Sequence, residues 1–451
     1  MNETSAASIE SNSGIEEFHG DDFRAPKSIF WAALLVRVAY MTLAHGYRTP
    51  PWNNHFEFGW ETGRVAASLA EGHGYSSPFS GNTGPTAWMV PGFTLILAGV
   101  FKIFGVYTAL SAWVIHVINC LFQSWTAVLV YEIGARMISR RNALWAAWIW
   151  ALNPGIAQYG VKWIWETSLS TFLFAAVLVL GIRMRGIGES APPRHRLLQW
   201  AAFGLLWGAI SMNNPTLLLM APIQGIWILY GVPGRKSLIR GVGLAAMAAG
   251  LSTAVALPWV IRNWIVFHAF IPTRSNFGAE AAMAWSPDSD GLPWGPTVYP
   301  AEGMAEHTIY ARMGELAYVK MRGNLAKQWA RQYPGHFWKL AALRFDMYWA
   351  SVPHGAGPAA AEAVRAWGYC LTSLCGIFGG ILAVKRKLPA AGLFAWAVVI
   401  LPMIYYFINA GSRFRNPLEP IFCVTGVFLF QQAGLRWGFT LPILRNLWPA
   451  R

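Results

Sequence analysis

The sequence predicts an all-α protein that crosses a membrane many times, and three observations support this. Of its 451 residues, 55% are hydrophobic, 15% are aromatic and only 12% are charged, which is not the balance of a soluble domain. Apolar runs of about 20 residues recur, and such a run can cross a bilayer core of about 30 Å. Short clusters of Lys and Arg separate the runs. Despite the net charge of +14, these clusters indicate topology signals rather than a nucleic-acid surface.

Ten membrane spans are expected. The first, 28–46, follows Arg24 and Lys27, so the positive-inside rule places the N-terminus in the cytoplasm. The other nine are expected at about 109–134, 142–158, 164–182, 198–212, 216–232, 240–260, 365–384, 389–408 and 418–434. Every strong basic cluster then lies on the cytoplasmic side.

The apolar segment 85–104 looks like a further span. If it crossed, the basic cluster of Arg136, Arg140 and Arg141 would lie outside, against the positive-inside rule. We therefore expect an amphipathic or re-entrant segment on the outer face.

The spans divide the chain into five parts. Residues 1–27 are rich in Ser, Glu and Asp and have little to bury, so a disordered cytoplasmic tail is expected. The second part is a transmembrane core at 28–260, which includes an external loop at 47–108 with interfacial helices. A second external loop at 261–364, C-terminal transmembrane helices at 365–434 and a cytoplasmic tail at 435–451 follow. The second loop contains a helical-looking stretch from about residue 306.

Charged residues gather in the first external loop, in the stretch NNHFEFGWETGRVAASLAEGHGYS at 53–76. At 100° per residue, Glu57, Glu61, Arg64, Ser68 and Glu71 span an arc of about 80°, which predicts a helix in the membrane interface. Two interpretations are open. The charges solvate a surface helix, or one carboxylate acts as a general base whose ionised form Arg64 favours. A plain salt bridge has the same spacing, so the pattern alone does not separate them.

A second acid, Glu166, lies at the outer end of the fourth span. A carboxylate this near the bilayer costs a few kcal/mol unless it is paired or faces a cavity, so a functional role is the first hypothesis. The alternative is a structural ion pair with Lys162, four residues earlier.

Four motifs resemble, in order over about residues 45–425, bacterial GT-C glycosyltransferases related to the protein O-mannosyltransferase and aminoarabinose-transferase group. They are EFGWETGRVAASLAEGHGYSSPFSGNTGPTAWMVPGFTLILAGVFKIFG, WIWETSLS, PWVIRNWIVFHAFIPTRSNFG and SRFRNPLEP. The resemblance implies a GT-C-type bundle of about ten transmembrane helices. It also implies a cell-envelope glycosyltransferase that moves a sugar, with inversion, from a polyprenyl-phosphate-linked donor to an acceptor.

The resemblance also suggests where the site lies. The acceptor would be a protein, a glycan or a lipid, and the site would be on the outer face of the bacterial cytoplasmic membrane. A carboxylate would be the general base, and arginines would bind the phosphate, because their planar forks pair with its oxygens. The catalytic candidates are Glu61 and Glu57, and the substrate-binding candidates are Arg64, Glu166, Arg262, Asn263, Arg413 and Arg415. Interfacial snorkelling is the alternative for the arginines of the last two motifs.

The first motif departs from the family pattern. The family commonly has an Asp, often in an Asp-Glu pair, where this chain has Glu57 followed by Phe58. This leaves open which of Glu57 and Glu61 is the base, and Glu61 is favoured because it lies at the fixed distance before RVA. The missing Asp also keeps a non-catalytic relative or membrane scaffold open.

A metal and a transport function are two further alternatives. His55 and Glu57 could be drawn as ligands of a divalent metal, but no second ligand cluster is identifiable, so the metal remains unknown. A transporter or flippase of lipid-linked saccharides should show charges at span centres or symmetric broken helices. Neither is clear in the sequence.

Overall fold

The computed structural model describes residues 24–48, 58–190, 196–231, 234–292, 299–300, 304–351 and 359–437. Within these ranges the regular elements are helices, apart from an isolated bridge between Ser76 and Pro85. The expected tail at 1–27 lies outside the described residues except for its last four positions, and the tail at 435–451 lies outside them after residue 437.

Four helices among the described residues are long and apolar enough to cross a membrane, which indicates an integral membrane protein. They are α5 (Ala109–Met137), α8 (Thr167–Met184), α11 (Arg235–Phe267) and the Ala366–Lys385 part of α16 (Ala359–Lys385). Shorter apolar helices are α4 (Pro91–Phe104), α9 (Leu197–Ser211), η3 (Pro215–Leu219) with α10 (Met220–Leu229), and α17 (Ala391–Ile400) with α18 (Met403–Phe407). The expected terminal spans correspond to α1 (Arg24–Leu43) and α20 (Glu419–Trp437).

A proline changes one of the expected spans. The span at 142–158 is broken into α6 (Arg140–Leu152) and α7 (Pro154–Val161), because Pro154 cannot continue the backbone ladder of α6. Asn153 caps the second piece by accepting from the N–H of Gly155 at 2.8 Å. In 85–104, the helix α4 has 14 residues, fewer than the roughly 20 needed to cross.

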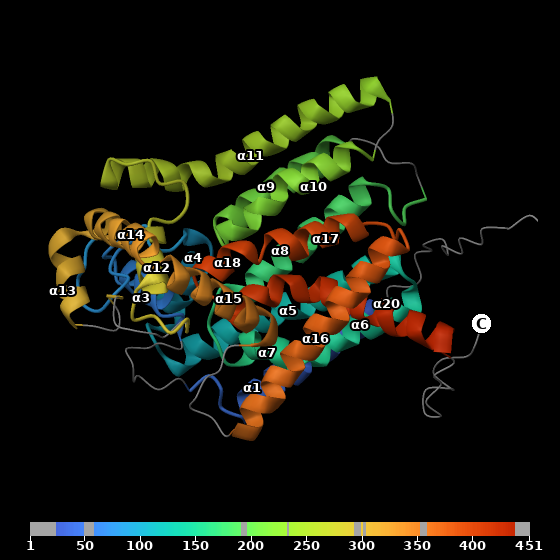
Figure 1. Cartoon of the computed structure of the whole chain (residues 1–451), viewed down its shortest axis with the longest axis horizontal. Helices are drawn as coiled ribbons and strands as arrows, with labels where there is room; N and C mark the ends of the chain where they lie inside the picture. Colours follow the sequence, from blue (N-terminus) through green and yellow to red (C-terminus); the bar gives the residue numbers. More distant parts are fainter. Residues whose placement is uncertain are drawn as a thin grey trace, which may run out of the picture.

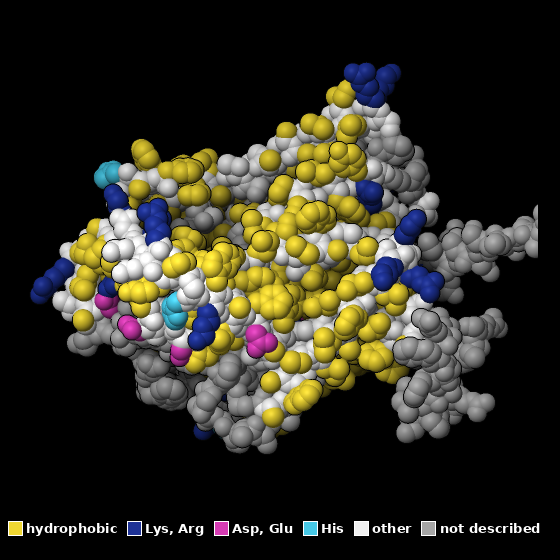
Figure 2. Space-filling view, viewed as in Figure 1, with side chains coloured by type: hydrophobic (Ala, Val, Ile, Leu, Met, Phe, Trp, Pro, Cys, Tyr) yellow, Lys and Arg dark blue, Asp and Glu magenta, His cyan; other side chains and the backbone are white. Residues whose placement is uncertain are grey.

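Segments from both expected external loops gather at one end of the bundle (Figure 1). These are α3 (Glu61–Ala70) and α4 from the first, and α12 (Phe277–Trp285), α13 (Met304–Met313), α14 (Glu315–Gln332) and α15 (Pro334–Ala350) from the second. Hydrophobic side chains cover the flank of the long helices, while Lys and Arg gather towards its two ends (Figure 2). This is the distribution of a membrane belt.

An aromatic cluster joins the two loop segments. Phe79 and Trp88 from the first pack edge-to-face, at 5.0 Å between ring centroids, and Phe79 packs in the same way on Tyr310 from the second, at 4.9 Å. Such pairs contribute about 0.5–1.5 kcal/mol beyond their buried area. The cluster therefore fixes the first loop against the second.

The helix α11 differs from the rest of the bundle because it packs mainly along α9 (Figure 1). Only 11% of its most apolar window is buried inside the protein. Most of this helix must therefore face lipid. Its C-terminal end leads directly into the second loop segment.

Candidate functional site

The position of Glu61 depends on a glycine turn. Gly59 has φ +79°, and a Cβ there would lie 2.5 Å from the carbonyl oxygen of Ile164, so only glycine fits. This close approach holds the start of α3 against the segment that leads into α8. Glu61 is the first residue of α3, where the helix dipole favours a negative charge.

The rest of α3 is more buried than the sequence predicted. The expected stripe runs along it, but Arg64 and Ser68 are buried at 9% and 6% exposure. Both side chains are therefore largely covered by protein, and among the described members of the stripe the exposed one is Glu71, just after the helix. The solvated-face interpretation fails for these two side chains.

A chain of two hydrogen bonds holds the Glu61 carboxylate. The hydroxyl of Tyr299 donates to Oε1 of Glu61 at 2.5 Å, and Nε1 of Trp88 donates to the same hydroxyl at 2.9 Å. Burial raises the pKa of Tyr299 well above its usual value, so this hydroxyl keeps its proton and remains a donor. The carboxylate is thus oriented from the second loop segment.

A second carboxyl, that of Glu280 on α12, lies close to Glu61. Burial and, after it, the negative charge of Glu61 raise the pKa of Glu280 to about 7, while Arg274, Arg413 and the Tyr299 hydroxyl oppose the shift. Nδ2 of Asn276 donates to Oε1 of Glu280 at 3.2 Å. Two carboxyls and two guanidinium groups from four segments therefore meet here.

The two arginines have unused hydrogen-bonding capacity. The guanidinium carbon of Arg413, on α19 (Ser412–Arg415), lies 3.9 Å from the ring centroid of Trp165. Nη1 of Arg413 and Nε of Arg274 are buried without a hydrogen-bond partner among the described residues. Unpartnered buried donors are costly, and guanidinium forks match phosphate oxygens. The pair is suited to bind an anion.

Glu166 joins the same neighbourhood. It is 7% exposed, and its Oε2 has no partner in the described part of the chain. The expected ion pair with Lys162 does not form, because that ammonium lies over the ring of Trp163 at 5.1 Å. Glu166, Arg274 and Arg413 all lie within electrostatic reach of Tyr405 on α18.

Arg262 and Asn263 are placed elsewhere, in a clamp on the first loop segment. Nη1 of Arg262 donates to the carbonyl of Thr86 at 2.7 Å and to Oδ1 of Asn263 at 2.9 Å, and Nη2 donates to the carbonyl of Tyr75 at 2.7 Å. Nδ2 of Asn263 donates to the carbonyl of Ile271 at 3.0 Å. These groups hold backbone, so they do not join the arginine pair.

Arg415 is also committed to internal contacts. It is fully buried, with Nε 2.8 Å from a carboxylate oxygen of Glu419. Nη1 donates to the carbonyls of Trp349 at 3.1 Å and Tyr369 at 3.0 Å. The two arginines of the SRFRNP motif therefore have different surroundings: Arg415 is engaged by a carboxylate and by backbone carbonyls, whereas Nη1 of Arg413 has no hydrogen-bond partner among the described residues.

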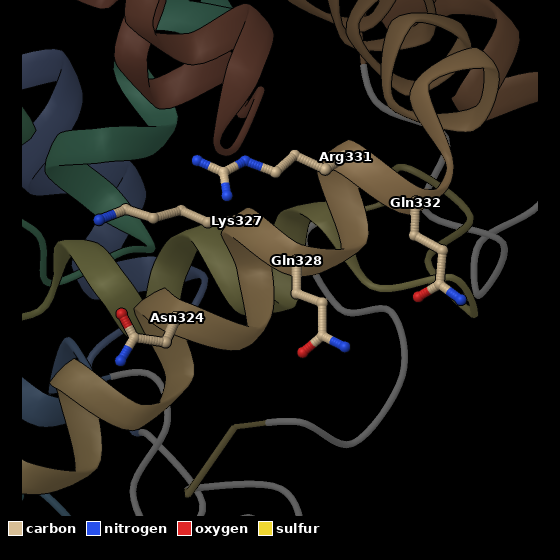
Figure 3. A pocket seen from close by; sticks show the side chains of 5 residues that line it. All are labelled: Asn324, Lys327, Gln328, Arg331 and Gln332. Carbon is tan, nitrogen blue, oxygen red and sulfur yellow. The ribbon is translucent and has the colours of Figure 1, made fainter.

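Arg64 borders a groove of 540 Å³ between α3 and the segment 73–82. A second hollow, of 490 Å³, lies along α14. Lys327 and Arg331 line it, and their side chains extend from α14 in the same direction (Figure 3). Its other lining residues are Asn324, Gln328 and Gln332. No residue of the Glu61–Arg413 cluster lines this second hollow.

The remaining metal and catalytic candidates, His55 and Glu57, lie outside the described residues. Within the described ranges, no three His, Cys, Asp or Glu side chains form a group that could hold a metal ion. We therefore derive no step through a metal.

Sequence reasoning missed Arg274, Glu280 and Tyr299. The first lies within the quoted PWVIRNWIVFHAFIPTRSNFG motif and the second two residues after it. The sequence prediction selected Arg262, near the start of that motif. The signal for the other two residues is a second Arg followed closely by a Glu in an otherwise uncharged stretch. Tyr299 carries no signal in one sequence.

Comparison with known proteins supports the fold. The sequence matches no protein-family model, and no curated protein is similar to it. An Archaeoglobus fulgidus oligosaccharyltransferase, solved with Zn and sulfate, superposes with a TM-score of 0.53 at 13% identity, over 93% of this chain and 51% of that one. The archaeal oligosaccharyltransferase AglB from the same organism, with an inhibitory peptide and a dolichol-phosphate, gives 0.52 at 12% identity, over 96% and 53%.

These two likenesses show a GT-C-like fold and nothing finer. The chain spans about half the length of these oligosaccharyltransferase chains. ArnT from Cupriavidus metallidurans, bound to undecaprenyl phosphate, overlaps with a TM-score of only 0.39 at 10% identity, over 90% of this chain and 78% of that one. That overlap carries no argument.

Proposed function

We propose that the protein is a membrane glycosyltransferase that moves a sugar from a polyprenyl-phosphate-linked donor to an acceptor hydroxyl. One observation carries the proposal: the Glu61 and Glu280 carboxyls lie within electrostatic reach of Arg274 and Arg413, whose buried N–H groups include ones with no partner in the described part of the chain. A base and an anion site are the two parts that such a transfer needs. The solved proteins of similar fold include one bound to a dolichol-phosphate.

The reaction follows from these groups. The acceptor oxygen attacks the anomeric carbon, and its proton passes to the carboxylate of Glu61. The bond between the anomeric carbon and the phosphate oxygen breaks, and the phosphate leaves with the electron pair. Arg274 and Arg413 stabilise the charge that gathers on it. Attack opposite to the leaving group inverts the anomeric centre.

Glu280 adjusts the charge of the site. Because its pKa is raised to about 7, it is largely protonated in mildly acidic conditions and then adds no charge beside Glu61. A neutral Glu280 leaves Arg274 and Arg413 free to bind the phosphate. Its ionisation would place a competing anion next to them.

The membrane and the side of the membrane are part of the proposal. The basic clusters between spans favour the cytoplasmic side for the opposite end of the bundle, which puts the Glu61 end on the outer face of a bacterial cytoplasmic membrane. A lipid-linked donor would reach it from the outer leaflet.

The test compares Glu61→Gln with Asp346→Asn in full-length protein in lipid nanodiscs. Asp346 is an exposed carboxylate on α15 and serves as the control. Sugar release or transfer is measured from a panel of undecaprenyl- and dolichyl-phosphate sugars. We expect Glu61→Gln to lower the rate about 10²- to 10⁴-fold with an unchanged melting temperature, and Asp346→Asn to have no effect.

Two outcomes would count against the proposal. Full activity in Glu61→Gln would show that this residue is not the base. If the wild-type protein transfers nothing but moves a fluorescent lipid-linked sugar between the leaflets of a vesicle, the transporter interpretation replaces the enzyme.

A further inference from the structure

The groove beside α3 has a chemical character of its own. Its 540 Å³ are lined mainly by hydroxyl, amide and small groups, together with the aromatic rings of Phe79 and Tyr107. Its charged groups are Arg64 and Glu71, of opposite sign, and the imidazole of His73 lies 3.6 Å from the Glu71 carboxylate. An apolar lipid tail would find few contacts here, and a phosphate would meet no excess of positive charge.

The walls of the groove are held in place by hydrogen bonds. Oγ of Ser68 lies 2.7 Å from Oγ of Ser76, and it also donates to the carbonyl of Gly74 at 3.2 Å. The carbonyl of Ser80 lies 2.7 Å from Nε2 of His307 on α13. The groove is therefore a preformed feature of the loop, and ordering it on binding would cost little entropy.

The groove is linked to the catalytic carboxylate through one helix. Arg64 lies one turn after Glu61 on α3, and the Glu61 charge acts on it. Arg274 and Arg413 act instead on Glu280 and do not line the groove. Glu61 does not line the groove itself, but it lies one turn from Arg64, which does, and its charge acts on both Arg64 and Glu280.

We propose that this groove binds an uncharged saccharide that supplies the acceptor hydroxyl, an inference that rests on the proposed function. Inverting transfer needs the acceptor and the phosphate on different sides of the anomeric carbon, with the base next to the acceptor. Hydroxyl and amide groups suit sugar hydroxyls, and aromatic rings suit the apolar faces of sugar rings. The proposal therefore selects a glycan acceptor over a protein or a lipid headgroup.

The test fills the groove without touching the base. Ser80 is exposed on the rim, so Ser80→Trp should fold, and Asn82→Ala removes an exposed amide from the same rim. The control is Ser190→Trp, at an exposed position outside the two loop segments. All three are prepared as full-length protein in nanodiscs, and their melting temperatures are compared.

The first measurement is saturation-transfer NMR with three probes: cellobiose, maltose and the disaccharide of N-acetylglucosamine. We expect at least one probe to contact the wild type and Ser190→Trp, and to lose contact in Ser80→Trp. Contact with none of them, or contact that persists in Ser80→Trp, would overturn the inference. This readout needs no activity and is independent of the proposed reaction.

The second measurement separates donor from acceptor. In Ser80→Trp the KM for the saccharide acceptor should rise about tenfold or more, as expected for one or two lost hydrogen bonds, and in Asn82→Ala by less. Hydrolysis of the donor by water should stay within about twofold. An equal fall in both rates at unchanged stability would place the donor in the groove and refute the assignment. If the wild-type protein neither hydrolyses the donor nor transfers its sugar, the proposed function is refuted instead. The NMR measurement then still tests whether the groove binds a saccharide.

Discussion

Glu280 and Glu315 are both carboxyls of the second loop segment whose pKa is raised by burial, yet their surroundings differ. Glu315 accepts hydrogen bonds from the hydroxyls of Ser275 at 2.6 Å and Tyr310 at 3.0 Å, from the backbone N–H of Ala87 at 2.7 Å and from the hydroxyl of Thr86. Its donors come from three segments. A side chain of this kind serves as a structural tie between the two loop segments.

Glu280, by contrast, accepts a hydrogen bond from Asn276, at the N-cap of its own helix, and interacts with the hydroxyl of Tyr299. Nearby charges also act on its pKa: the negative charge of Glu61 raises it, and the positive charges of Arg274 and Arg413 lower it. Those arginines keep N–H groups that no described residue uses. Burial and a raised pKa are therefore common to both carboxyls, and the role proposed for Glu280 depends instead on the unused N–H groups of its neighbours.

The largest expected effect comes from removing each carboxyl in turn. Glu315→Ala leaves three buried donors and the half-buried hydroxyl of Ser275 without this acceptor, at about 1–3 kcal/mol for each unsatisfied buried group, so we expect stability to fall by about 3 kcal/mol or more. Glu280→Ala should cost less than about 1 kcal/mol. Thermal unfolding in nanodiscs measures both. Equal losses would break the distinction between the two sites.

The next effect concerns the two arginines of one motif. Arg413→Gln should weaken binding of a short-chain prenyl phosphodiester about 10- to 100-fold, as for the loss of charged hydrogen bonds, with little change in melting temperature. Arg415→Gln should lower the melting temperature and leave this binding largely unchanged, because the bonds of Arg415 to Glu419 and to the carbonyls of Trp349 and Tyr369 are structural. Arg331→Gln, at an exposed position on α14, is the control and should change neither. Weaker binding in Arg415→Gln at an unchanged melting temperature would contradict the distinction between Arg413 as a ligand-binding residue and Arg415 as a structural one.

The smallest effect is a pH dependence. The pKa of Glu280 is raised to about 7, so this group is neutral below that pH and a competing anion above it. The affinity for the prenyl phosphodiester, whose own charge is constant in this range, should therefore fall a few-fold as pH rises through about 7. Titration calorimetry at several pH values would measure this. Glu280→Gln should give a flat profile, and a variant that keeps the wild-type slope would rule out Glu280 as its source.

The sequence predicted the class of fold well because hydropathy and basic clusters report directly on the bilayer. It predicted Glu61 as a candidate because its stripe and motif are local. It could not separate Arg413 from Arg415, two residues apart, since their surroundings come from segments more than 40 residues away. It could not identify Tyr299 either, because the hydroxyl of Tyr299 donates to Glu61, a residue 238 positions earlier in the chain.

The clamp made by Arg262 has a mechanical consequence. This residue lies on α11, a helix that the rest of the protein leaves mostly uncovered. It donates to the carbonyls of Tyr75, within the segment 73–82 that borders the groove, and of Thr86, just after that segment. A helix in lipid tilts when the bilayer becomes thinner or thicker than its apolar length. A tilt of α11 would pull on the loop that carries the groove. We therefore expect the thickness of the surrounding membrane to change the position of this loop and the shape of its groove.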